Sequence, residues 1–363
     1  MPTMRRSTLL TALLVLASAA SGCRSPAPAG LPPADGYLPG ADGLRIHYRV
    51  LGTGPESVVA VHGGPGAGIQ SILPELEPLA ARYRVIFYDQ RGGGLSELPA
   101  DTDLLGVSHH VADLEAVRRF FRLERMSVIA LSFGALLVAR YAEEHPGRVE
   151  RMVFFGATGL RRAQAAELAR VAPATGDPAA RERFGALLRS LMSGSSADPV
   201  ADCREYEAIG RELAIGRGES GAWRGTSCAM PPEALRYSFQ HTARLGPRSL
   251  GDWDFTDSLG HVEAPLLVIH GAGDARGAEL QRAWAEAVPH GRLLLLPGAG
   301  KGVSADRPDL FFPAVETFLE GEWPPAAMEA PAAMDGGAGG SVDPGKEVSS
   351  CAARPCSSPP QPP

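Results

Sequence analysis

The segment from Val128 to Val138 reads V-I-A-L-S-F-G-A-L-L-V and is the most informative part of the chain about its architecture. An apolar run ends abruptly at Ser132, small residues flank it at Ala130 and Gly134, and a helix-period stretch follows. This pattern predicts a strand, a very sharp turn and a helix. In so tight a turn the central residue is forced toward positive φ, and its neighbours two places away must be small. The side chain of Ser132 is therefore expected to stand out beyond the end of a sheet strand.

The match of this turn to the G-x-S-x-G pattern is incomplete, because Ala130 stands where the first glycine is usual. Alanine fits that position with some crowding. A serine between small residues is also typical of an ordinary turn, so the motif by itself leaves both interpretations open.

Strands and helices alternate on both sides of this turn, which predicts a parallel sheet with helices on both faces. The strands are expected at Gly43–Val50, as an edge strand, and at Ser57–Val61, Arg84–Tyr88, Val149–Phe155, Pro265–His270 and Arg292–Leu296. The helices are expected at Ile72–Ala81, Val107–Phe121, Gly277–Val288 and Asp309–Glu320.

The composition is that of a globular protein with room for one large domain and an insertion. The chain has 363 residues, of which 44% are hydrophobic and 21% are charged. Its net charge of −6 is spread without runs, so no nucleic-acid partner is expected. No cysteine and histidine spacing fits a metal site, and no cofactor is expected.

The first 22 residues have the pattern of an export signal. Two arginines precede an apolar stretch from Leu9 to Ala19, which is too short to span a bilayer comfortably. The A-S-G-C that ends at Cys23 resembles the lipobox of bacterial lipoproteins, so Cys23 is expected to carry a lipid. The protein is then anchored to a bacterial membrane, facing the periplasm or the exterior. The alternative is an ordinary secretory signal, cut near Ala19 or Ala20, and a secreted protein.

Two segments are too poor in apolar residues to form a core. Residues 23–39 are rich in Pro and Ala and are expected to act as a tether, and residues 323–363 are expected to be a disordered tail. Export makes disulfides possible, and the simplest pairing joins Cys203 to Cys228 and Cys351 to Cys356. Free thiols remain open, because pairing cannot be deduced from sequence alone.

Two glycine-rich motifs follow predicted strands. H-G-G-P-G, from His62 to Gly66, makes a loop whose backbone N–H groups can approach a ligand closely, although a plain turn is the alternative. D-Q-R-G-G-G-L-S begins at Asp89. Its Asp89 and Arg91 are close enough to pair with each other and to pin the neighbouring loops, which indicates an architectural role.

In their order and spacing, these two motifs and A-L-S-F-G at Ala130 resemble the α/β-hydrolase fold, and within it the prolyl aminopeptidase (proline iminopeptidase) group. The resemblance implies a mostly parallel sheet with helices on both faces, built from residues 40–158 and 251–322. It also implies a helical cap at residues 159–250, inserted after the sixth strand, which roofs the site. Ser132 is then the nucleophile, and the N–H groups of Gly64 and Phe133 form the oxyanion hole.

The resemblance places the triad acid just past the strand that ends at His270, where Asp274 stands. A solvated loop aspartate is the alternative. After the last strand the family has its catalytic histidine following G-A-G, but this chain has Lys301 there. Keeping a lysine neutral at pH 7 requires its pKa to fall by about 3 from ~10.4, at a cost of roughly 4 kcal/mol. The ammonium form, paired with Asp274, is therefore expected, and it leaves Ser132 without a base.

The sequence nominates no other histidine as the base, although an unidentified one, such as His241 in the cap, stays open. His290 precedes the last strand and is expected at the opposite end of the sheet, about 15 Å or more away. His62 is expected to be structural. The sequence does not place His109, His110, His241 and His261. In the resembled aminopeptidases cap carboxylates hold the amino terminus of the substrate, but none is assigned among Glu205, Glu207, Glu212, Glu219 and Glu233.

Two functions follow from these observations. The first is an exported serine hydrolase that cleaves amide or ester bonds of small molecules or short peptides, with turnover impaired by Lys301. The alternative is a catalytically inactive pseudo-hydrolase that acts as a tethered binding protein. A non-peptidase esterase is a third option.

Overall fold

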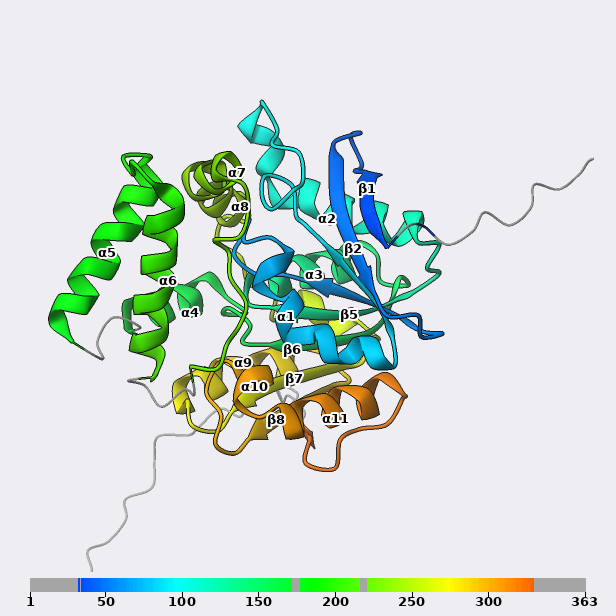
Figure 1. Cartoon of the computed structure of the whole chain (residues 1–363). Coiled ribbons are helices and arrows are strands. Elements are labelled where there is room, and N and C mark those ends of the chain that lie inside the picture. Colours follow the sequence, from blue (N-terminus) through cyan, green and yellow to red (C-terminus); the bar gives the residue numbers. More distant parts are fainter. Residues whose placement is uncertain (1–31, 33, 172–176, 216–220, 330–363) are drawn as a thin grey trace, which may run out of the picture.

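The computed structural model describes residue 32 and residues 34–171, 177–215 and 221–329 (Figure 1). The predicted export signal, the lipid site at Cys23 and the predicted Cys351–Cys356 pair lie outside these residues. In the part of the chain that is described, no helix is both long enough and apolar enough to cross a membrane.

A nine-stranded sheet forms the centre of the molecule, in the order β1-β2-β4-β3-β5-β6-β7-β8-β9. The six strands from β4 to β8 in this order are parallel, and β1, β2 and β9 are antiparallel to their neighbours. The predicted, mostly parallel sheet is therefore confirmed. The strands are β1 Asp35–Pro39, β2 Arg45–Leu51, β3 Ser57–Val61, β4 Arg84–Tyr88, β5 Met126–Leu131, β6 Val149–Phe155, β7 Leu266–Gly271, β8 Gly291–Leu296 and β9 Met328–Glu329.

Helices cover both faces of this sheet. Val128 and Ala130 of β5 face one apolar cluster, and Ile129 faces the other, so both faces of the strand are buried. This explains why β5 is a continuous apolar run rather than an alternating one. The first cluster includes helices α2 (Val107–Phe120), α3 (Phe133–Glu144) and α9 (Ala275–Ala287), and the second includes α1 (Leu73–Leu76) and α11 (Pro308–Leu319).

The structure differs from the predicted sheet at both edges. Strand β1 lies outside β2, so the predicted edge strand is an inner one, and β1 itself falls within the stretch expected to be a tether. Its Leu38 is 1% exposed and joins the core, which anchors the strand. Strand β9 pairs with β8 through two residues of the stretch expected to be a disordered tail.

The helix predicted at Ile72–Ala81 is also broken. It forms the four-residue α1 and then a 3₁₀ segment at Glu77–Ala81. Pro78 has no N–H to donate to the preceding turn, and its ring clashes with the carbonyl of that turn, so a regular α-helix cannot continue through it.

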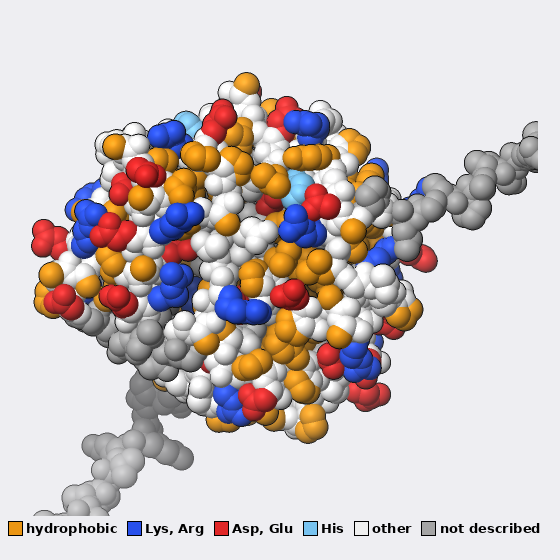
Figure 2. Space-filling model, viewed as in Figure 1, with side chains coloured by type: hydrophobic (Ala, Val, Ile, Leu, Met, Phe, Trp, Pro, Cys, Tyr) orange, Lys and Arg blue, Asp and Glu red, His pale blue; other side chains and the backbone are white. Residues whose placement is uncertain are grey.

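A helical cap is inserted between β6 and β7, as predicted from the resemblance. It lies beside the sheet, at the left in Figure 1, with α5 and α6 packed side by side. Acidic and basic side chains intermingle on the cap surface that Figure 2 shows. The cap contains α4 Arg162–Val171, α5 Pro178–Ser193, α6 Pro199–Ile215, α7 Pro232–Tyr237, the π-helical segment Ser238–Thr242 and α8 Ala243–Ser249.

Candidate active site

Ser132 occupies the turn between β5 and α3 with φ 53° and ψ −118°. Positive φ is strained for a residue with a side chain, and such strain marks functional turns. A β-carbon placed on Gly134 would lie 2.5 Å from the carbonyl oxygen of Val61, so the backbone of β3 allows only glycine there. Ala130, fully buried, takes the position two residues before the serine. The sharp turn predicted from the sequence is therefore present.

Ser132 lines a cavity of about 430 Å³ between the sheet and the cap. Core residues supply one side, including Gly63, Gly64 and Lys301. Helix α5, helix α6 and a following loop supply the other, with aromatic side chains at Phe184, Tyr206 and Trp223. The rings of Phe184 and Tyr206 stack with centroids 4.3 Å apart. The cap thus roofs a serine at the carboxyl edge of the sheet with aromatic side chains and with polar ones such as Glu207.

The two predicted oxyanion donors flank Ser132. Phe133 is the first residue of α3, so its N–H is among the four that have no partner within a helix. Gly64, with φ 119°, lines the same cavity. A β-carbon on the neighbouring Gly63 would lie 3.0 Å from Cβ of Ser132, which shows how closely this loop approaches the serine.

Asp274 stands just past β7 and caps the N-terminus of α9. Its carboxylate accepts hydrogen bonds from the N–H of Gly277 at 3.0 Å and from Nε2 of His270 at 3.1 Å. The hydrogen bond from His270 holds the pKa of Asp274 below its ordinary value against the effect of burial, and the charge of Lys301 acts in the same direction. Lys301 therefore shares the cavity with Ser132 and acts electrostatically on Asp274.

His270 is the residue that the sequence analysis missed. It is the penultimate residue of β7, is 2% exposed, and lies under the first turn of α9, where a β-carbon on Gly277 would clash with its ring. The one sequence feature that could have pointed to His270 is its spacing of four residues from Asp274, at the end of a buried strand. His270 does not line the cavity of Ser132, and neither does any other histidine of the described chain.

Both ring nitrogens of His62 form hydrogen bonds with backbone groups of nearby loops. Its Nε2 accepts the backbone N–H of Gln90 at 3.0 Å, so the proton is on Nδ1, which donates to the carbonyl oxygen of Gly63 at 2.7 Å. The ring is fully buried, and burial lowers its pKa. His62 is thus a neutral imidazole with both nitrogens occupied, which is the structural role expected of it.

Two further histidines, His110 and His290, are also unsuited to act on Ser132. Burial, helped by the charge of Arg91, lowers the pKa of His110 to about 3. His290 lies 3.7 Å from Glu263 on the surface and just before β8, at the opposite end of the sheet.

Asp89 and Arg91 pin loops as predicted, but they do not pair with each other. Asp89 accepts hydrogen bonds from Nδ1 of His47 at 2.7 Å and from two backbone N–H groups. Arg91, fully buried, makes two 2.7 Å bonds to Asp113 and a 2.8 Å bond to Asp42. The predicted pair was wrong because each group meets better-placed partners on other segments.

Among the five cap glutamates, Glu207 is the one that lines the cavity within the described residues. Its carboxylate accepts the hydroxyl of Thr226 at 2.6 Å and the N–H of Ser227 at 2.7 Å, and Arg211 lies 3.9 Å away. Glu205 pairs with Arg183 on the surface, Glu212 and Glu233 are exposed, and Glu219 lies outside the described residues.

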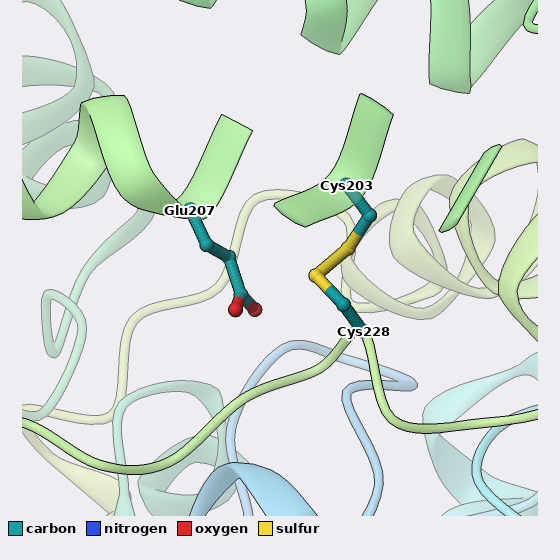
Figure 3. Close-up of side chains that lie close together, drawn as sticks. All are labelled: Cys203, Glu207 and Cys228. Atoms are coloured by element: carbon teal, nitrogen blue, oxygen red, sulfur yellow. A yellow bond between two sulfur atoms is a disulfide. The ribbon is translucent and has the colours of Figure 1, made fainter. Parts of the chain in front are cut away.

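A disulfide joins Cys203 of α6 to Cys228, close to this carboxylate (Figure 3). The two sulfurs and a carboxylate oxygen of Glu207 lie within 4.8 Å of one another, a spacing that a metal ion could use. Cysteine binds metals as a thiolate, however, and these sulfurs are bonded to each other. As built, the group is a disulfide beside an acid and does not form a metal site.

The strained serine turn, the roofed cavity and the parallel sheet together define a hydrolase-type scaffold. The alpha/beta hydrolase fold family matches residues 56–308, and the chain belongs to that family. The predicted fold class is thus confirmed.

Within the family, the chain resembles proline iminopeptidases. The enzyme of Lactobacillus helveticus is 25% identical over 290 residues, which are 77% of this chain and 95% of that one. A probable proline iminopeptidase of Streptomyces coelicolor is 38% identical over 159 residues, which are 41% of this chain and only 47% of that one.

Solved structures share the fold. Proline iminopeptidase of Mycobacterium smegmatis superposes with a TM-score of 0.57 at 22% identity, over 79% of this chain and 97% of that one. A thermophilic esterase of Thermogutta terrifontis gives a TM-score of 0.53 at 20% identity, over 79% of this chain and 98% of that one. The protein is therefore an α/β-hydrolase that resembles prolyl aminopeptidases.

Proposed function

We propose that this protein is an exported serine hydrolase of the prolyl aminopeptidase type, with Ser132 as its nucleophile and with impaired turnover. One observation carries the proposal: Ser132 lines the roofed cavity together with Lys301, while no histidine of the described chain does so. The nucleophile and its binding site are kept, and the base is replaced.

The proposed reaction begins with attack of Ser132 Oγ on the carbonyl carbon of an amide or ester. The N–H groups of Phe133 and Gly64 stabilise the negative charge that develops on the carbonyl oxygen. The leaving amine or alcohol departs, and water then hydrolyses the acyl-serine. Each step needs a base or acid near Ser132, and an ammonium group at Lys301 cannot accept the serine proton. In the slow reaction, water takes that proton during attack and supplies a proton to the leaving group.

The loss of the base sets the expected rate. Removing a triad member costs on the order of 10⁴ to 10⁶ in rate, while binding and the oxyanion hole leave about 10³ over the reaction in water. Slow acyl transfer is therefore expected in place of fast turnover.

The proposed substrates are small amides, esters or short peptides with a free amino terminus. Glu207 of the cap lines the cavity, as Asp306 of the core does, and offers a carboxylate to an ammonium group. This supports the choice, and so does the similarity to the proline iminopeptidases named above. The carboxylate of Glu207 accepts two hydrogen bonds that fix its position in the cavity, where it can bind an ammonium group.

Export and lipidation of Cys23 complete the proposal, with the protein anchored to a bacterial membrane and facing the periplasm or exterior. The signal pattern of residues 1–22 supports it. Mass spectrometry of the mature protein tests it: an acylated N-terminal Cys23 is expected, and a free N-terminus near Ala20 would indicate secretion instead.

The test of the chemistry is labelling with a fluorophosphonate, compared between the native protein, Ser132→Ala and Lys301→His. Labelling of the native protein that is lost in Ser132→Ala supports the enzyme. Labelling that occurs only in Lys301→His contradicts it and supports the alternative, a tethered binding protein without chemistry. Hydrolysis of p-nitrophenyl esters without hydrolysis of aminoacyl amides would identify a non-peptidase esterase.

A further inference from the structure

We infer that the Cys203–Cys228 disulfide is a positioning element for the carboxylate of Glu207, and through it sets the selectivity of the cavity for ligands with an ammonium group. The inference deepens the proposed function and rests on it for the class of ligand. It concerns the cap and not the chemistry at Ser132.

The first observation is the placement of Cys203 and Glu207 on one helix. They are four residues apart in α6, so their side chains project from the same face, one turn from each other. Figure 3 shows both side chains pointing from α6 toward the loop that carries Cys228. Cys203 is fully buried and Glu207 is partly buried, so the helix presents the disulfide to the cap interior and the acid to the cavity.

The second observation is the segment that faces them. Residues 223–228, which we name the strap, contain no helix or strand and line the cavity at Trp223, Gly225, Thr226 and Ser227. Both hydrogen bonds that hold Glu207 come from the strap, at its two residues before Cys228. The N–H of Cys228 itself donates to the hydroxyl of Thr226 at 3.0 Å. The disulfide therefore ends the same short turn that orients the acid.

The third observation is that the other end of the strap is attached to the core. The buried carboxylate of Glu75 accepts the N–H groups of Arg224 at 2.6 Å and Gly225 at 3.0 Å. The N–H of Thr226 donates to the carbonyl oxygen of Gln70 at 3.0 Å. The core thus fixes the position of the strap. The disulfide links α6 covalently to the strap, between two cysteines that are 25 residues apart in the sequence.

Glu207 consequently keeps its place because α6 and the strap cannot move apart. Without the S–S bond, the described residues of α6 and the strap are held together by apolar packing around Cys203 and Cys228 and, beside the cavity, by hydrogen bonds to a partly exposed carboxylate. Water can replace these hydrogen bonds. A mobile carboxylate binds an ammonium group with lower affinity, because the carboxylate loses conformational freedom on binding and this entropy cost reduces the binding free energy. A neutral ligand makes no use of the carboxylate, so its binding is expected to be unaffected.

The experiment measures the affinity of prolinamide, as a small amine ligand, by calorimetry on the full chain. The variants are the disulfide variant Cys203→Ser/Cys228→Ser, the variant Glu207→Gln, and a combined variant that carries these three substitutions. The matched control is Cys351→Ser/Cys356→Ser, which removes the cysteines of the tail. We expect affinity to fall about tenfold in the disulfide variant and at least as far in Glu207→Gln, with the combined variant no weaker than Glu207→Gln alone.

Several results would overturn the inference: an unchanged affinity in the disulfide variant, losses that multiply in the combined variant, or no binding of prolinamide to the native protein. If the disulfide variant does not fold, the Cys351→Ser/Cys356→Ser protein is measured before and after reduction, with the same expected loss. Fluorophosphonate labelling of Ser132 is read in parallel. Labelling without an effect of the disulfide refutes only the inference, and absence of labelling refutes only the proposed chemistry.

Discussion

The carboxylate of Asp274 accepts a hydrogen bond from Nε2 of His270, 3.1 Å away and four residues earlier in the chain. The acid expected to orient a catalytic histidine thus holds a histidine, but one that lies under helix α9, away from the cavity of Ser132. His270 has Nδ1 without a hydrogen-bond partner in the described chain. The hydrogen bond from His270 to Asp274 therefore holds the residue that caps the N-terminus of α9, and it does not involve Ser132.

Restoring the imidazole is expected to restore turnover. Under the proposed function, Lys301→His returns a base to the cavity that Ser132 lines, within electrostatic reach of Asp274. We expect the rate of hydrolysis of an aminoacyl amide to rise at least a hundredfold. This is less than the factor, on the order of 10⁴, that a triad base contributes to the rate. Lys301→Gln is the control, since it removes the charge and adds no base. Equal rates in both variants would show that the base is not what limits the reaction.

Substitutions at the two small residues of the serine turn are expected to destabilise the protein to different extents. Gly134→Ala brings a β-carbon to 2.5 Å from the carbonyl oxygen of Val61, so β3 and α3 must separate. We expect a loss of about 2 to 4 kcal/mol in the free energy of unfolding, measured with urea. Ala130→Gly completes the G-x-S-x-G pattern and is expected to cost only about 1 kcal/mol, because glycine in a strand loses more entropy. A Gly134→Ala variant as stable as the native protein would contradict the close contact.

The strap is expected to detach when Glu75 is changed to glutamine. Glu75 is 2% exposed, and its carboxylate accepts the N–H groups of Arg224 and Gly225. Both N–H groups donate to Oε1, and the amide oxygen of glutamine is a weaker acceptor than a carboxylate oxygen, so amide exchange at residues 224–227 should speed up by at least tenfold. Glu77→Gln, on the exposed side of the same segment, is the matched control. Unchanged exchange in Glu75→Gln would mean that other contacts hold the strap.

Acid is expected to destabilise the protein partly through Glu115. The hydrogen bond from Arg118 is the main cause that lowers the pKa of Glu115 to about 2, and Tyr141 and Arg119 add to it. Since the folded pKa lies below the ordinary value of 4.5, the contribution to stability is complete above pH 4.5 and is lost as the pH falls toward 2. After allowance for solvent screening, the contribution is roughly 1 to 2 kcal/mol. Urea unfolding at pH 3 and pH 6 should show a smaller difference for Glu115→Gln than for the native protein.

Most of the central sheet was predictable because its strands are buried on both faces. Strands β3, β4 and β6 begin and end where the apolar runs predicted them, since such runs are bounded by polar or glycine residues. Strand β1 was not predicted, because its five residues follow a Pro and Ala-rich stretch and only pairing with β2 makes them a strand. Short edge strands gain their stability from neighbours that a local pattern does not reveal.

Most core strands and helices and the serine turn were predictable from the sequence, because each is a local pattern. The motif position of Lys301 led to the proposal that it stands in place of a histidine. Only the tertiary structure decided which polar groups meet. It paired Asp274 with His270, separated Asp89 from Arg91, and brought Glu207 into the cavity of Ser132. Periodicity selects the buried face of an element, but the partners of a charged side chain depend on how elements distant in sequence pack together.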